Sequence, residues 1–148
     1  MEHNAPWAIL FNNDAFIAKQ GTLMGRHAAG SAYLRALANE GYKECAILTR
    51  NNYERQNFIN LFKSFLNDKK IDLNLLPWDR PDLSKDYGGI FLGDPQLGNQ
   101  SVLRSNFGHN KYSIVGITHT TMSKGIMDFL ADIIYKPVQE WDSLICTS

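Results

Sequence analysis

The chain has 148 residues, with 15 basic and 15 acidic side chains and therefore a formal net charge of zero. This length suits a single domain with a sizeable core, and the charge balance excludes a strong electrostatic attraction to nucleic acid or to an anionic membrane. No stretch approaches the roughly 20 apolar residues of a membrane span, and residues 1–14 lack the basic and apolar regions of a signal peptide, so we expect a cytoplasmic protein without a nucleic-acid partner.

Six short apolar runs predict the strands of a sheet. They span residues 7–11, 45–49, 73–76, 89–92, 114–117 and 143–147. Segments with helical spacing of apolar residues alternate with these runs, which is typical of an α/β fold class with a mostly parallel sheet, here of about six strands. Cys45 and Cys146 lie in separate runs, which predicts two buried thiols. Their spacing is not that of a zinc site, and we expect neither a metal nor a cofactor.

A long connection, residues 12–28, follows the first apolar run. Strand-to-helix connections usually take about 2–6 residues, and longer ones are often functional; a decorative insertion is the alternative. The connection ends in a glycine loop, Gly25-Arg26-His27-Ala28-Ala29-Gly30, before a helix that stops at Gly41. The apolar face of that helix is predicted to carry Ala29, Tyr33, Ala36 and Leu37.

A glycine loop before a helix lets the backbone come close to a ligand, and free amides at a helix N-terminus favour anions. Gly25, Arg26 and His27 are therefore candidate substrate contacts. For His27, a solvated loop residue is an equal alternative. The sequence contains neither GxGxxG nor GK[ST], so it has neither the dinucleotide fingerprint nor the P-loop.

The middle of the chain carries weaker signals. Asn51 and Glu54 have the spacing of a helix-capping pair. Asp94 directly follows a predicted strand, where it is either a turn former before proline or a contact to a ligand. A short helix is predicted over residues 101–107. We interpret Arg104 and Lys111 as exposed charges available to an anion.

The most informative stretch is residues 112–130, where an apolar strand is followed by a polar turn and a helix. The polar turn consists of Thr118, His119, Thr120 and Thr121. The helix carries Ile126, Phe129, Leu130, Ile133 and Ile134 at helical spacing and ends before Lys136-Pro137. In open parallel sheets, ligands bind just beyond the carboxyl ends of the strands. The turn is therefore the predicted functional site.

His119 is the candidate catalytic residue of this turn. A neutral histidine can accept a hydrogen bond from a ligand hydroxyl or donate one to it, and Thr118, Thr120 and Thr121 add further hydroxyl groups to the turn. From the residues alone, a structural hydrogen bond at the start of the helix is an equal interpretation of His119. Thr121 or Ser123 can cap that helix.

Three segments give the chain a resemblance to a known family. They are GRHAAGSAYLRALANEGY (residues 25–42), YSIVGITHTTMS (112–123) and KPVQEWDSLICTS (136–148). In these segments, and in the order of its elements, the chain resembles the N-terminal half of the retaining glycosyltransferases of family 4, which have the two-domain GT-B fold. The double glycine typical of the family's first loop is replaced here by Arg26-His27-Ala28-Ala29.

The resemblance implies that residues 1–148 form one Rossmann-like, three-layer α/β/α domain on the acceptor side of such an enzyme. The family transfers a sugar from a nucleotide-sugar donor to an acceptor, with retention at the anomeric carbon and without a metal. Its C-terminal domain, which this chain lacks, binds most of the nucleotide. We therefore expect the protein to continue past Ser148, and the chain alone to have little or no hexosyltransferase activity.

The resemblance also assigns residues and partners. His119 matches the family's histidine that contacts the donor sugar, and Thr118, Thr120 and Thr121 beside it have hydroxyl groups suited to carbohydrate. For such a reaction, the residues themselves make Gly25 and Arg26 candidates to approach the diphosphate from the other side. The expected acceptor is a carbohydrate or a lipid-linked molecule, and a lipid-linked acceptor would bring the protein to a membrane surface.

Two other classes of protein remain alternatives. One is a nucleotide- or dinucleotide-binding α/β domain of a different enzyme, although the second strand ends in Thr49-Arg50 instead of the acid that binds a ribose. The other is a non-catalytic domain that recognises a carbohydrate or a protein.

Overall fold

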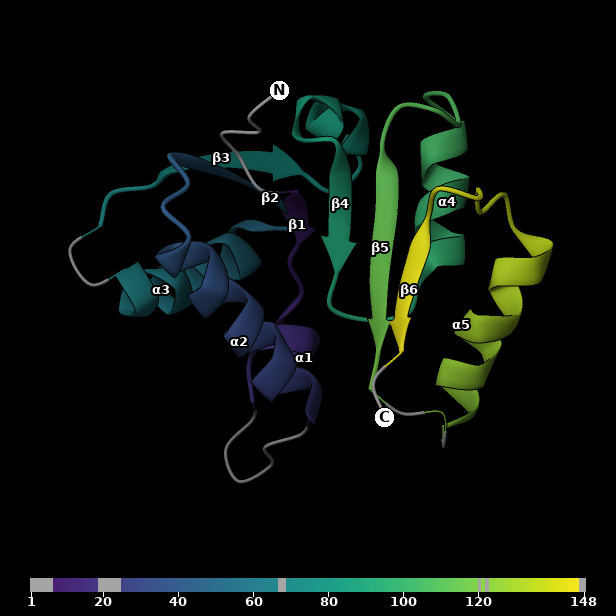
Figure 1. Ribbon diagram of the computed structural model, residues 1–148, viewed down its shortest axis with the longest axis horizontal. Helices are drawn as coiled ribbons and strands as arrows, with labels where there is room; N and C mark the ends of the chain where they lie inside the picture. The colour runs from purple at the N-terminus through teal and green to yellow at the C-terminus, as the bar shows by residue number, and fades with distance from the viewer. Residues whose placement is uncertain (1–6, 19–24, 67–68, 120, 122, 147–148) are drawn as a thin grey trace.

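The computed structural model describes residues 7–18, 25–66, 69–119, 121 and 123–146 of the chain. Its strands are β1 (Ala8–Leu10), β2 (Glu44–Thr49), β3 (Asp72–Pro77), β4 (Gly89–Leu92), β5 (Ser113–Thr118) and β6 (Ser143–Cys146). Its helices are α1 (Asn13–Phe16), α2 (Gly25–Asn39), α3 (Asn52–Leu66), the 3-10 helix η1 (Pro81–Tyr87), α4 (Leu97–Ser105) and α5 (Lys124–Tyr135). The strands form one sheet in the order β3-β2-β1-β4-β5-β6, and each neighbouring pair is parallel (Figure 1). The predicted α/β class is confirmed.

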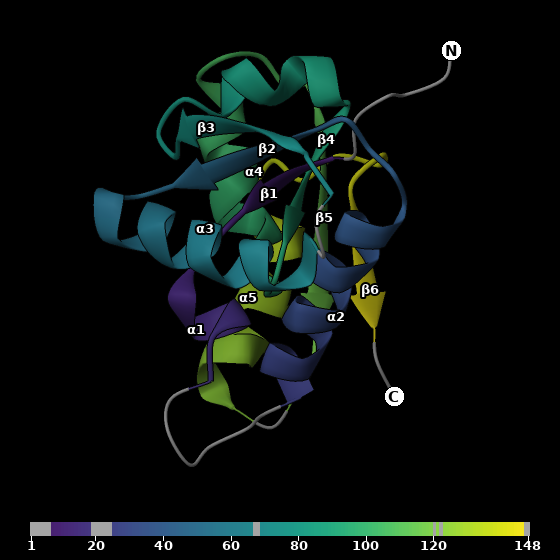
Figure 2. The same cartoon turned by 90° about the vertical axis from the view of Figure 1, so that its left-hand side faces the viewer.

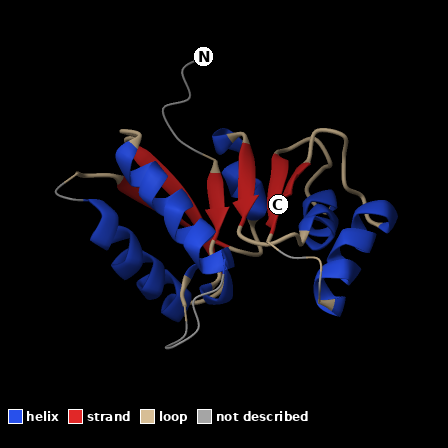
Figure 3. Ribbon diagram, turned by 60° about the horizontal axis from the view of Figure 1, so that its bottom comes forward, coloured by secondary structure: helices blue, strands red, loops and turns tan. Residues whose placement is uncertain are grey.

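Helices cover both faces of the sheet (Figure 3). Successive residues of a strand point to opposite faces, and here both sets are apolar. Ile9 and Phe91 pack with residues of α1, α2 and α3 on one face. Leu10 and Leu92 pack on the other face with Leu97 of α4 and with residues of η1 and α5. The three-layer α/β/α arrangement predicted from the sequence is therefore present.

Helices α2 and α3 lie side by side on one edge of the molecule (Figure 2). Phe58 of α3 is fully buried, and its ring meets the ring of Phe11 edge-on at 5.3 Å. Asn51 caps α3, since its Oδ1 accepts a hydrogen bond of 2.9 Å from the backbone N–H of Glu54. The predicted capping pair is confirmed, but the Glu54 carboxylate accepts from the N–H of Arg50 instead of that of the cap residue.

Helix α2 begins earlier than the sequence predicted. Residues 25–30 form its first turns instead of a loop, and the helix buries His27, Gly30, Leu34, Leu37 and Ala38. Of the predicted apolar face, Leu37 is buried and Ala29 and Tyr33 are half-buried as expected, whereas Ala36 is exposed. The physical reason for the earlier start is the contact with α1. A Cβ on Gly30 would lie 2.8 Å from the carbonyl oxygen of Ala15, so the two helices meet at this glycine. The predicted stop at Gly41 is confirmed by its positive φ of 81°.

Further corrections concern α4, α5 and β6. Helix α4 begins at Leu97 instead of Ser101. In α5, which ends before Lys136-Pro137 as predicted, Ile134 is 80% exposed, whereas the other predicted apolar positions are half-buried. Cys45 is buried as predicted, but Cys146 is exposed because β6 forms an edge of the sheet.

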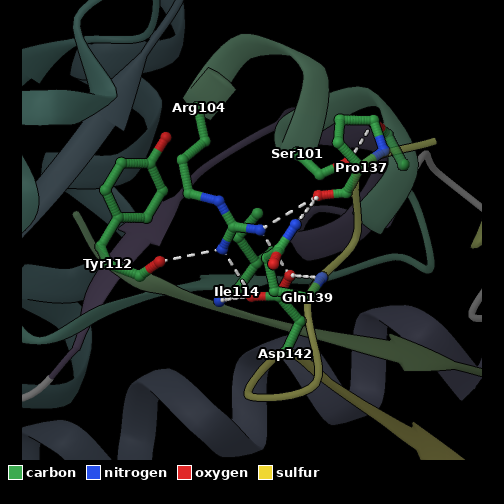
Figure 4. A network of polar contacts seen from close by, with 8 residues as sticks. Ser101, Arg104, Tyr112, Ile114, Pro137, Gln139 and Asp142 are labelled. Carbon is green, nitrogen blue, oxygen red and sulfur yellow. Dashed lines mark hydrogen bonds and ion pairs between the residues drawn. The ribbon is translucent and has the colours of Figure 1, made fainter. Parts of the chain in front are cut away.

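A buried ion pair joins α4 to the loop before β6 (Figure 4). Arg104 is fully buried, so its interpretation as an exposed charge is wrong. Its two Nη atoms donate to the two carboxylate oxygens of Asp142, each at 2.6 Å, and Nη1 also donates to the carbonyl oxygen of Tyr112 at 2.9 Å. Such a bidentate pair fixes orientation as well as distance.

Asp142 is satisfied by more than the guanidinium. Its carboxylate accepts hydrogen bonds from the backbone N–H groups of Ile114, at 2.9 Å, and Gln139, at 2.8 Å. Ile114 belongs to β5, so the carboxylate connects the loop before β6 with the neighbouring strand. Because burial of a charge is costly without partners, this network determines how the last crossover returns to the sheet.

Candidate functional site

The strand order reverses between β1 and β4. The chain builds β1, β2 and β3 outward in one direction, and β4, β5 and β6 in the other. In open α/β sheets, ligands bind outside the carboxyl ends of the strands at such a switch point. At this edge the described residues form a cavity of about 640 Å³, which lies within the size range of small-molecule sites. Residues from the ends of β1, β2 and β4 and from α1, α2, α3 and α5 line it.

The floor of the cavity is held together by hydrogen bonds between the two central strands. Asn12, directly after β1, caps α1 by accepting from the N–H of Ala15 at 2.7 Å. Its Nδ2 donates to Oδ2 of Asp94, beyond β4, at 3.2 Å. Gln96 donates to the same carboxylate from its backbone N–H at 3.1 Å and from Nε2 at 3.0 Å. Burial raises the pKa of Asp94, and these three hydrogen bonds oppose that shift.

Two glycines let the chain pass close to this floor. A Cβ on Gly93 would lie 2.8 Å from the Cβ of Ala15 in α1. A Cβ on Gly116 in β5 would collide with Leu97 and lie 2.8 Å from the carbonyl oxygen of Asp94. The turn that carries Asp94 therefore packs directly onto the backbones of its neighbours, which fixes the position of the carboxylate.

His119, the predicted catalytic residue, follows β5 and is half-buried. Burial lowers the pKa of its imidazole, Arg26 lowers it further, and Asp94 raises it. His119 is therefore within electrostatic reach of two other predicted site residues, Arg26 in α2 and Asp94 beyond β4. Among the described residues, the buried Nε2 of His119 has no hydrogen-bond partner. A neutral imidazole with an unused ring nitrogen is suited to exchange a hydrogen bond with a ligand.

The three candidates from the glycine loop have different positions. Arg26 is exposed in the first turn of α2 and lines the cavity. His27 is buried, and its Nε2 lies 3.1 Å from the carbonyl oxygen of Asp14, so it connects α2 with α1. A Cβ on Gly25 would meet no atom within 4 Å, so the described residues require no glycine there. Of these three, Arg26 is the residue placed toward the cavity.

The predicted threonines differ in their exposure to solvent. Thr118 is buried at the end of β5, and Thr121 is exposed. Thr120 lies outside the described residues. Of the two residues predicted as possible caps of α5, Ser123 is the N-cap, since its Oγ accepts a hydrogen bond of 3.3 Å from the N–H of Ile126.

Several polar residues of the cavity were missed by the sequence analysis as site residues. They are Asn12, Asn13, Arg50, Tyr53, Asn57 and Gln96. Most of them follow a strand directly or lie in the first turns of the next helix, which is the same positional signal that selected Asp94 and His119. The amide side chains after the first strand were the clearest signal, because Asn-Asn-Asp follows its last apolar residue at once.

The part of the chain that the structure describes contains no cluster of histidine, cysteine and carboxylate side chains that could hold a metal ion. None of its helices is both long and apolar enough to cross a membrane. Comparisons with protein-family models, with curated proteins and with solved structures found no match for the chain.

Proposed function

We propose that this chain is the acceptor-side domain of a retaining glycosyltransferase that moves a sugar from a nucleotide-sugar donor to a carbohydrate or lipid-linked acceptor. The observation that carries the proposal is that Asp94 and Arg26 line a cavity at the switch point of the sheet, while His119 is close enough to both for their charges to shift its pKa. The resemblance of residues 25–42 and 112–148 to family 4 glycosyltransferases selects this reaction among those that an α/β sheet can support.

The charges around His119 suit the proposed reaction. Cleavage of a bond between a sugar and a nucleoside diphosphate develops positive charge on the sugar and negative charge on the leaving group. His119, held neutral by its lowered pKa, can hydrogen-bond a sugar hydroxyl without adding positive charge next to the sugar. Arg26, in the first turn of α2, supplies the positive charge that a diphosphate would require.

The test is a release assay with the complete product of the gene. The protein is incubated with UDP-, GDP- and ADP-linked hexoses and a glycan extract, and the nucleoside diphosphate is measured. We expect release from at least one donor, and a decrease of about 100-fold or more in His119→Ala, the scale of a lost transition-state hydrogen bond. The matched control is His109→Ala, because His109 is exposed in the turn before β5 at the opposite edge of the sheet.

Both variants should unfold at the temperature of the unmodified protein, since His119 is only half-buried. Absence of release from every donor, or near-normal release by a folded His119→Ala variant, would refute the proposal.

A dinucleotide-binding domain is the second candidate, and the strand order favours it. The order 3-2-1-4-5-6 is that of classical dinucleotide-binding folds, in which an arginine near the second strand can accept the 2′-phosphate of NADP; here Arg50 follows β2 and lines the cavity. Against it, the first turn contains Asn12 and Asn13 where a pyrophosphate requires glycines. Calorimetric titration with NADP separates the two candidates, because micromolar binding to this chain would favour the second.

A further inference from the structure

An exposed aromatic ring forms part of one wall of the cavity. Tyr53 is the second residue of α3, lines the cavity, and is 70% exposed. A single exposed aromatic residue is common on protein surfaces. The position of Tyr53 is informative because a polar residue of the same cavity, Asn57, lies four residues later and therefore on the same face of the helix.

The amide of Asn57 belongs to a chain of hydrogen-bonded polar groups in the lining of the same cavity. Its Nδ2 donates to Oδ1 of Asn13 at 3.1 Å, which connects α3 with the first turn after β1. Asn12 and Gln96 continue the polar surface toward β4 through their hydrogen bonds to Asp94. The lining of the cavity therefore combines an aromatic ring with several amides, whose carbonyl and NH₂ groups both accept and donate hydrogen bonds.

The charges of the lining favour a neutral ligand. Two guanidinium groups, those of Arg26 and Arg50, stand against three carboxylates, those of Asp14, Glu54 and Asp94. The lining as a whole therefore has no excess of positive charge that would favour a phosphate-rich ligand throughout the cavity, and only Arg26 is assigned to the diphosphate of the donor. A pyranose ring, in contrast, has an apolar C–H face for an aromatic ring and a rim of hydroxyl groups for amides and carboxylates.

We propose that Tyr53 and Asn57 form a subsite for a neutral pyranose ring, the terminal sugar of the acceptor. This inference rests on the proposed function, since it assigns the acceptor to the cavity beside His119. The sugar stacks on the phenol ring of Tyr53, and its hydroxyl groups bond to the amides of Asn57 and Asn13. Tyr53 is thereby a residue that determines acceptor specificity and takes no part in bond cleavage.

The experiment uses saturation-transfer NMR with the purified chain. The probes are the methyl glycosides of glucose, galactose, mannose and N-acetylglucosamine. At least one should bind, with the strongest transfer to its ring C–H protons. We expect Tyr53→Ala to weaken binding about tenfold, as for the loss of an aromatic contact, and Tyr53→Phe to change it less than about twofold, because stacking does not need the hydroxyl.

Tyr135→Ala is the matched control. Tyr135 is 84% exposed at the end of α5 and is not among the residues that line the cavity, so its loss should leave binding unchanged. The inference is overturned if no glycoside binds, if Tyr53→Ala binds like the unmodified chain, or if Tyr53→Phe loses as much affinity as Tyr53→Ala. Uridine that displaces the glycoside and depends equally on Tyr53 would also overturn it, by identifying a nucleobase site.

The outcome separates this inference from the proposed function. Binding through Tyr53 without nucleoside diphosphate release would leave a sugar subsite in a protein that is not a transferase. Release that depends on His119, together with glycoside binding that ignores Tyr53, would leave the transferase and remove the subsite.

Discussion

Replacement of Arg104 by methionine tests how far the buried ion pair stabilises the domain. The substitution keeps an unbranched side chain as far as the position of Nε and removes the rest of the guanidinium, so Asp142 loses both 2.6 Å hydrogen bonds while its carboxylate remains buried. Removal of one partner from a buried pair typically costs about 3–5 kcal/mol, mainly because the remaining charge is uncompensated. A domain of this kind has a free energy of unfolding of about 5–15 kcal/mol.

The measurement is urea unfolding followed by circular dichroism, together with thermal unfolding. We expect a lower urea midpoint at an unchanged slope, and a decrease in melting temperature of about 6–20 °C, from about 2–4 °C per kcal/mol for a chain of this length. Asp142→Ala should cost at least as much, because it also removes the acceptor of the Ile114 and Gln139 N–H groups.

Arg80→Met is the matched control. Arg80 and Asp82 also form a bidentate pair, at 2.8 Å for each hydrogen bond, but the Arg80 side chain is 51% exposed. Water and salt screen such a pair, so its loss should leave the melting temperature almost unchanged. The reasoning is refuted if a folded Arg104→Met variant loses no more stability than Arg80→Met.

Three further predictions concern the site and the sheet. Gly116→Ala should lower the free energy of unfolding by about 1–3 kcal/mol, since its Cβ would collide with the turn beyond β4. Gly125→Ala, in open space in α5, should raise the free energy of unfolding by up to about 1 kcal/mol. The opposite order of the two variants in urea unfolding would be inconsistent with this packing. A thiol reagent should modify the exposed Cys146 in the native chain, but Cys45 only after unfolding, because burial raises the pKa of Cys45 to about 12. Fast reaction of both thiols in the native chain would contradict the burial of Cys45. In an NMR titration His119 should show a pKa below 6.5, the value for an unperturbed histidine. Its contribution to stability is then fully present above pH 6.5 and is lost as the pH falls through the lower pKa of the folded state. A pKa at or above 6.5 would refute the assigned burial.

The strands could be predicted because each is an apolar run, as expected for a parallel sheet covered on both faces. Local hydrogen bonds could be predicted equally well, since the helix caps at Asn51 and Ser123 involve residues three positions apart. The start of α2 could not be placed in this way. It depends on the close contact of Gly30 with Ala15, and no local propensity reports that contact.

The candidate site was predictable in part. Asp94 and His119 were selected because polar residues that directly follow buried strands lie at the carboxyl edge of the sheet. The same rule applied to Asn12 would have added the residue that joins the two central strands. Tyr53 and Asn57 were harder to recognise, because an exposed tyrosine and an amide on a helix do not by themselves indicate a site. Their place in the lining of the cavity depends on the position of α3 beside the switch point.

The sequence by itself determined the alternation of strands and helices, because burial on both faces requires apolar residues that are contiguous in the chain. Only the tertiary structure decided the strand order, which depends on pairing between segments far apart in sequence. It also decided the roles of two charges. Arg104 can be buried because its Nη2 lies 2.6 Å from Oδ2 of Asp142, a residue that is 38 positions away in the chain. Arg26 lies within electrostatic reach of His119 because α2 begins at the edge of the sheet where β5 ends, and such proximity arises when the sheet is assembled.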